Sequence, residues 1–170
     1  AAVRLDPQRR LVVEMLARTG LRVTEFCELT HDAIVKMNET NWLRVPVGKL
    51  HTDRYVPLHP SIIELHRTWR EWAGPDDTGR LISNHGRVLN RYTVGRNVAA
   101  CARIAGIGHV HPHQLRHTLA TQSINNGMSL EAIAQMLGHR SMRMTLVYAR
   151  IADRTVADEY FAAADKVDQL

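Results

Sequence analysis

The chain has 170 residues, of which 45% are hydrophobic and 23% charged, and its formal net charge is +5. This length suffices for one hydrophobic core and is short for two ordinary domains. Two distant cysteines, Cys27 and Cys101, make neither a disulfide framework nor a cysteine-based zinc site, so we expect a reducing, cytoplasmic location. Apolar runs are short and the first residues show no signal-peptide pattern, which argues against a membrane or secreted protein.

The basic residues are biased toward arginine, since only Lys36, Lys49 and Lys166 are lysines among 22 basic residues. The planar guanidinium group binds phosphate bidentately, so this bias favours a nucleic-acid partner. Arginine replacing lysine in a GC-rich genome would explain the same bias without any ligand. Composition alone leaves both explanations open.

Helical signals open the chain. Asp6 is a predicted N-cap, Pro7 the first helical residue, and Gly20 the end of this helix. A short second helix is predicted over 23–29. The hydrophobic period then changes to that of strands, which predicts a small antiparallel sheet. The predicted strands cover 33–37, 42–47 and 54–57, with turns at 38–40 and 48–49.

Helical patterns dominate the remainder. The predicted helices cover 61–72, 93–105, 112–126, 129–137 and 142–148. An apolar stripe from Val156 to Val167 predicts a further helix in the tail, residues 153–170. We therefore expect one domain over 1–170, mostly α with a small three-stranded antiparallel sheet, an α+β fold.

Two segments in the first third carry residues suited to phosphate chemistry. Arg22 stands at a turn into a helix, with Glu25 one helical turn later; alone this is typical of an intrahelical ion pair. Lys49 lies at the tip of the predicted hairpin between strands, where a lysine is normally just solvated.

Two later segments add a proton-transfer group and a nucleophile. His113 and Arg116 project from the same helical face, a combination that suits a phosphate oxygen, although a His-rich surface turn gives the same pattern. Tyr148 follows His139 by nine residues. A tyrosine in a basic setting can be a nucleophile, and an isolated one is more often a half-buried core residue.

Taken in order, the four segments resemble the active-site boxes of the tyrosine recombinase (phage integrase) family. The matching segments are TGLRVTEF at 19–26, GKLHTDRYVPL at 48–58, HPHQLRHTLAT at 111–121 and LGHRSMRMTLVY at 137–148. The resemblance covers about residues 8–150, essentially a whole catalytic domain. It implies that family's fold, and that the chain is a fragment lacking an N-terminal core-binding domain.

The resemblance implies a site-specific DNA recombinase that cleaves and rejoins strands through a 3′-phosphotyrosyl intermediate, with no cofactor, metal or ATP. The implied partners are double-stranded DNA and further copies of the chain in a tetrameric synapse, without a membrane, in the cytoplasm at the nucleoid. Seven residues take part under this interpretation. They are the nucleophile Tyr148, the base His113, the general acid Lys49, the phosphate ligands Arg22, Arg116 and His139, and the supporting residue Glu25, which orients Arg22.

The hairpin departs from the family pattern. Leu50 stands where a glycine is usual, Thr52 where a second lysine is frequent, and Arg150 where many members have histidine. The basic residues left on the hairpin are Lys49 and Arg54, so these departures bear on DNA contacts and not on the chemistry.

Two other functions compete with recombination. The ten histidines, four of them in the segment 109–117, suggest a metal-dependent nuclease, but two histidines flanking a proline with Glu131 as a distant carboxylate are a poor ligand set for a hard catalytic metal. A DNA-binding module that has lost its chemistry is the other alternative. The presence of all the candidate catalytic residues argues against it.

Overall fold

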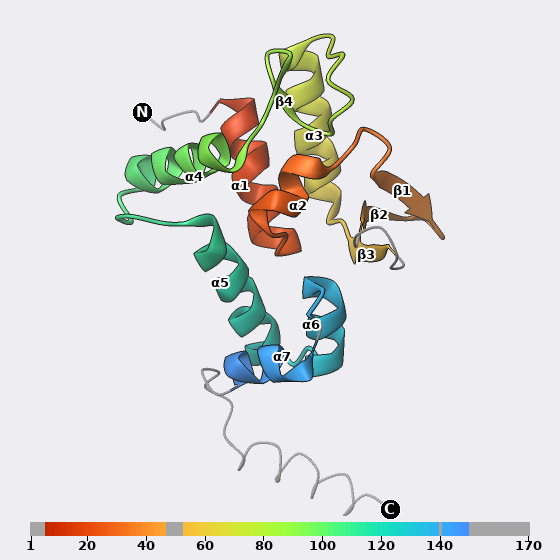
Figure 1. Cartoon of the computed structure of the whole chain (residues 1–170), viewed down its shortest axis with the longest axis vertical. Coiled ribbons are helices and arrows are strands. Elements are labelled where there is room, and N and C mark those ends of the chain that lie inside the picture. The colour runs from red at the N-terminus through yellow and green to blue at the C-terminus, as the bar shows by residue number, and fades with distance from the viewer. Residues whose placement is uncertain (1–5, 47–52, 140, 150–170) are drawn as a thin grey trace, which may run out of the picture.

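The computed structural model describes residues 6–46, 53–139 and 141–149 (Figure 1). The first half contains helices and a sheet: α1 (Pro7–Thr19), α2 (Val23–Glu28), β1 (Ile34–Met37), β2 (Thr40–Val45) and β3 (Arg54–Pro57). Strand β2 lies in the middle of the sheet and pairs antiparallel with both neighbours. The second half is mainly helical: α3 (Pro60–Ala73), β4 (Ser83–Asn84), β5 (Arg87–Val88), α4 (Arg91–Ala105), α5 (Pro112–Asn125), α6 (Leu130–Leu137) and α7 (Met142–Ala149).

Helix α1 is the centre of the core. Its first turn is capped by the Asp6 carboxylate, which accepts a hydrogen bond from the backbone N–H of Arg9 at 2.9 Å, and Pro7 needs no such partner. Apolar residues three and four apart, such as Leu11 and Met15, are fully buried. Because α1 packs against α3, α4 and α5, it joins the two halves of the domain.

The sheet shows strand alternation along β3. Val56 is fully buried, whereas Tyr55 and Pro57 are exposed. Arg54, two residues before Val56, is on the same face of the strand, and helix α6 packs against β3 on the inner side. The side chain of Arg54 therefore lies on the inner face of β3, the same face as the core residue Val56.

Helices α5, α6 and α7 form a group below α1 in Figure 1. Helix α6 packs against α7 and β3, and α5 packs against α1 and α7. The predicted fold class, mostly helical with a three-stranded antiparallel sheet, is confirmed. No helix within the described ranges combines the length and apolar character needed to cross a bilayer.

The structure corrects several predicted boundaries and adds a hairpin. Strand β2 begins at Thr40, two residues earlier than predicted, and α4 begins at Arg91 because Asn90 caps it. The β4–β5 hairpin was not predicted from the sequence: its strands have two residues each, too short for a period to show. The predicted turn at 48–49 and the tail 153–170 lie outside the described residues.

Candidate active site

Three arginines from distant segments converge on the carboxyl end of α6. They donate hydrogen bonds to three successive carbonyl groups: Arg54 to Met136 at 3.1 Å, Arg116 to Leu137 at 2.8 Å and Arg22 to Gly138 at 3.3 Å. The last carbonyls of a helix lack partners within the helix and carry the negative end of its dipole. They therefore hold cations close together without neutralising them.

Arg116 is the most deeply placed of the three. Its side chain comes from α5, is only 2% exposed, and donates its second Nη group to the carbonyl oxygen of Gly20 at 2.5 Å. Gly20 ends α1 in a left-handed conformation (φ 63°), and a Cβ there would lie 2.5 Å from a methyl group of Leu137. The close approach of these two helix ends fixes the guanidinium of Arg116 from both sides.

A single carboxylate, that of Glu25, lies between Arg22 and Arg54. Its Oε1 atom accepts from Arg22 Nη1 at 2.8 Å and from Arg54 Nη1 at 2.9 Å. Its Oε2 atom accepts from the backbone N–H of Arg22 at 2.8 Å and from Arg54 Nη2 at 2.9 Å. The side chain of Arg22 remains 39% exposed while that of Arg54 is 9% exposed, so Arg22 is the arginine of this pair that a ligand can reach.

Electrostatics keep Glu25 ionised. Burial by itself raises the pKa of this carboxyl, but hydrogen bonds from Arg54, from the Arg22 backbone and from the Arg22 side chain, together with the charge of Arg54, lower it to about 2. Glu25 is therefore a permanent anion, and the cluster of three arginines keeps an excess of positive charge suited to a phosphate.

His139 follows the end of α6 directly and connects it to α7. Its Nδ1 atom lies 2.8 Å from the hydroxyl oxygen of Thr145, a fully buried residue of α7. Burial, followed by the charges of Arg116, Arg22 and Arg54, lowers the pKa of His139 to about 4, so its imidazole is neutral near pH 7. Tyr148 lies on α7, three residues after Thr145.

His113 stands in the first turn of α5, one turn before Arg116. Its ring meets that of His117 edge to face, with centroids 4.3 Å apart. Burial lowers the pKa of His113 below its usual value, and the charges of His117, Arg116 and Arg22 lower it further. A neutral imidazole at pH 7 is the form that a general base requires.

The structure thus brings Arg22, Glu25, Arg116 and His139 to the end of α6 and sets His113 one helical turn from Arg116. Lys49 lies outside the described residues. The expectation that Arg54 remains on the hairpin as a basic group for DNA is wrong, because its guanidinium is ion-paired with Glu25 and nearly buried. Strand alternation was the available signal, since it assigns Arg54 to the same face as a core valine.

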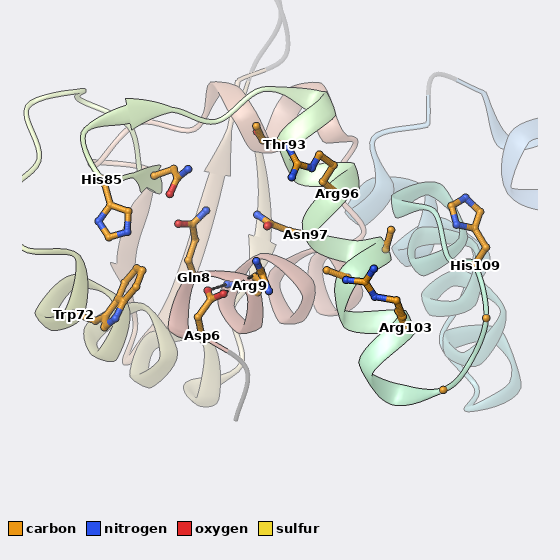
Figure 2. Close-up of a pocket in the computed structure, with 15 residues that line it drawn as sticks. Asp6, Gln8, Arg9, Trp72, His85, Thr93, Arg96, Asn97, Arg103 and His109 are labelled. Carbon is orange, nitrogen blue, oxygen red and sulfur yellow. Dashed lines mark hydrogen bonds and ion pairs between the residues drawn. The ribbon is translucent and has the colours of Figure 1, made fainter. Parts of the chain in front are cut away.

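A separate cavity of about 1010 Å³ lies between the start of α1, the end of α3 and α4 (Figure 2). Arg9, Arg96 and His109 line it, and the rings of Trp72 and His85 are in contact at one end, with centroids 4.9 Å apart and planes inclined at 54°. Among the predicted site residues whose side chains the structure describes, none lines this cavity. Across the described part of the chain, no group of three or more His, Cys, Asp or Glu side chains is placed to hold a metal ion.

Comparison with known proteins identifies the family. The model of the phage integrase family matches residues 3–155, and the chain belongs to this family. It is 37% identical to the tyrosine recombinase XerA of Pyrococcus furiosus over 147 residues, which are 84% of this chain and 50% of that protein. The chain spans about half the length of the curated relatives it matches.

Two solved structures share the fold. The crystal structure of XerA recombinase superposes with a TM-score of 0.78 and 30% identity, covering 93% of this chain and 57% of that one. The XerH site-specific recombinase bound to palindromic difH substrate, a post-cleavage complex, gives a TM-score of 0.76 at 23% identity, covering 96% of this chain and 46% of that one. At 23% identity, the similarity to XerH shows a shared fold.

Proposed function

We propose that this chain is the catalytic part of a tyrosine site-specific recombinase, which cleaves and rejoins DNA through a 3′-phosphotyrosyl intermediate. The observation that carries the proposal is the convergence of Arg22, Arg116 and His139 on the end of α6, with α7, the helix of Tyr148, starting three residues after His139. Membership of the phage integrase family supports it.

The proposed reaction begins with the phenol of Tyr148. A tyrosine phenol in water has a pKa of about 10 and is only about 0.1% ionised near pH 7, so attack on phosphorus needs a base. His113, whose lowered pKa keeps it neutral, takes the phenolic proton. The new bond joins the tyrosine oxygen to phosphorus, and the bond between phosphorus and the 5′ oxygen breaks.

Charge on the phosphate and on the leaving group is handled by separate residues. Arg22 and Arg116 stabilise the charge that develops on the non-bridging oxygens, and His139 hydrogen-bonds the same phosphate. Lys49 protonates the departing 5′ oxygen. The phosphotyrosyl bond keeps the energy of the phosphodiester, so a 5′-hydroxyl from another strand can reverse the step and reseal the DNA.

The proposed partners follow from this chemistry. The substrate is double-stranded DNA, and exchange of two duplexes requires four active sites, hence a homotetrameric synapse. We also propose a preceding core-binding domain, because the matched relatives are about twice as long as this chain. The place of action is then the cytoplasm, at the nucleoid.

The test is covalent trapping with a pool of duplexes whose recognition arms are randomised and which carry a nick beside the scissile phosphate. The short cleaved fragment diffuses away, so a complex that survives SDS accumulates and its DNA can be sequenced. We expect trapping by the parent chain in EDTA and none by Tyr148→Phe. Trapping by Tyr148→Phe would assign the nucleophile to another tyrosine. Tyr55→Phe and Tyr92→Phe, at two exposed positions, are the matched controls and should trap like the parent.

The same experiment separates the alternatives. A metal-dependent nuclease would release fragments without a covalent complex and would stop in EDTA. A silent DNA-binding module would enrich a binding sequence and cleave nothing.

A further inference from the structure

We propose that Arg54 is a positioning residue of the active site, which holds Glu25, and through it Arg22, against the end of α6. The proposal rests on the proposed function and deepens it. It removes Arg54 from the DNA-contacting surface and assigns it to the machinery behind the phosphate-binding arginines.

Every nitrogen of the Arg54 guanidinium is already engaged, and its charge is balanced by a carboxylate, whereas the buried Arg116 donates to neutral carbonyl oxygens. Nη1 and Nη2 each donate to one oxygen of Glu25 at 2.9 Å, and Nε donates to the carbonyl oxygen of Met136 at 3.1 Å. The side chain is 9% exposed. A bidentate fork in this geometry is rigid, and a lysine, with a single ammonium group, cannot reproduce it.

Arg54 changes what Glu25 does to Arg22. With one guanidinium, the carboxylate would pair with Arg22 alone and oppose its binding of a phosphate. With two guanidinium groups, each Glu25 oxygen accepts hydrogen bonds from both arginines. Oε1, for example, lies 2.8 Å from Arg22 Nη1 and 2.9 Å from Arg54 Nη1. Arg54 therefore leaves Glu25 able to orient Arg22 while weakening its hold on the charge that the phosphate needs.

Arg54 also ties strand β3 to the turn that carries His139. The backbone of Gly138 lies so close to the Arg54 guanidinium that a Cβ at this position would be 2.6 Å from Nη1. Because Gly138 directly precedes His139 and its carbonyl accepts from Arg22, we expect loss of this contact to displace the Arg22 and His139 segments together.

The test uses Arg54→Lys, which keeps the charge and nearly the length, and Arg54→Gln, which keeps a polar but shorter side chain, with Arg54→Ala as the extreme case. Arg44→Lys is the matched control, since Arg44 lies on the neighbouring strand and pairs with the exposed Asp32 at 2.6 Å. Two quantities are measured for each: the rate of covalent-complex formation at saturating DNA, and the dissociation constant for DNA over a range of salt. Thermal unfolding confirms that each variant is folded at the assay temperature.

We expect Arg54→Lys and Arg54→Gln to slow cleavage by roughly a hundredfold, the scale of a misplaced reacting group, with affinity and salt dependence unchanged. Arg44→Lys should leave both quantities at the parent level. If Arg54→Lys cleaves like the parent, the forked geometry has no role and the proposal fails. It also fails if cleavage at saturating DNA is unchanged while the salt slope falls by about 0.9, the signature of one lost phosphate contact.

A measurement without DNA keeps this test separate from that of the proposed function. In the free chain, the pKa of Glu25, about 2 in the parent, should rise in Arg54→Lys when followed by carboxyl carbon NMR. An unchanged pKa would overturn the positioning role even in a chain that recombines DNA. A parent chain that shows the lowered pKa but never forms a covalent complex would overturn the proposed function instead.

Discussion

Arg22 and Gly138 are 116 residues apart in the chain, and the guanidinium of the first donates to the carbonyl oxygen of the second at 3.3 Å. This contact joins the segment that follows α1 to the end of α6. Since α6 ends in a left-handed glycine, the carbonyl of Gly138 turns away from the helix axis toward the arginine. The site thus depends on the conformation of one residue that has no side chain.

Substituting Gly138 tests that dependence. Gly138→Ala should lower stability by more than the 1–2 kcal/mol or so that a left-handed alanine costs, because its Cβ would lie 2.6 Å from Arg54 Nη1. Gly106→Ala is the control, with a similar φ of 68° and nothing within 4 Å of the added carbon. Urea unfolding measures the loss of stability in both variants. Equal losses would show that the Arg54 side chain moves aside without a cost in free energy.

His139 should titrate well below an ordinary histidine. The pKa of about 4 means that its imidazole proton signals stay constant from pH 8 to about pH 5 in the free chain and move only below that. The folded state favours the neutral imidazole, whereas the unfolded chain takes up the proton near pH 6.5. The contribution of His139 to stability is therefore complete above pH 6.5 and is lost as the pH falls toward 4. NMR titration with a histidine peptide as reference checks the value, and a midpoint near 6.5 would contradict it.

Glu25 should make the fold sensitive to acid. Its carboxyl has an ordinary pKa of 4.5 when unfolded and about 2 when folded, so its contribution, at most about 3 kcal/mol, is present above pH 4.5 and is lost as the pH falls toward 2. Glu25→Gln should be less stable than the parent at pH 6 and should lose less on acidification. Unfolding curves at pH 6, 4 and 3 measure this, and parallel losses in the two proteins would refute the assignment.

Lys49, the proposed general acid, is tested through the leaving group. Lys49→Ala should slow cleavage by roughly 10²- to 10⁴-fold on ordinary DNA. On a substrate with sulfur in place of the bridging 5′ oxygen, which leaves without a proton, it should cleave nearly as fast as the parent. Arg116→Ala should stay slow on both substrates because the phosphate charge is then unbalanced. Failure of sulfur to restore cleavage would make Lys49 a DNA-positioning residue, with His139 the next candidate for the acid.

Local chemistry explains which parts of the fold could be predicted. Asp6, Pro7 and Gly20 each carry their own signal for a helix boundary, and the structure places the ends of α1 where those signals do. The β4–β5 hairpin carries less signal: Gly86, at φ 72°, marks its turn, but strands of two residues are too short to show a hydrophobic period.

Long-range pairing explains what could not be predicted in the site. The spacing of three between Arg22 and Glu25 predicts their ion pair, and the structure contains it. Nothing in the local sequence indicates that Glu25 has a second and more buried partner 29 residues later. The contacts with the α6 carbonyls leave no signal in the sequence either, because every residue carries the same backbone acceptor.

The meeting of three arginines at the end of α6 limits where the chain can change length. Each residue inserted in α6 would rotate its final turn by about 100° and advance it by 1.5 Å, which would withdraw the Met136, Leu137 and Gly138 carbonyls from all three guanidinium groups at once. The segment between α3 and β4, residues 74–82, makes no contact with these arginines in any of the hydrogen bonds described. Insertions should therefore be accepted at 75–77, ahead of the residues that pair with 28–31, and rejected between Ser129 and His139.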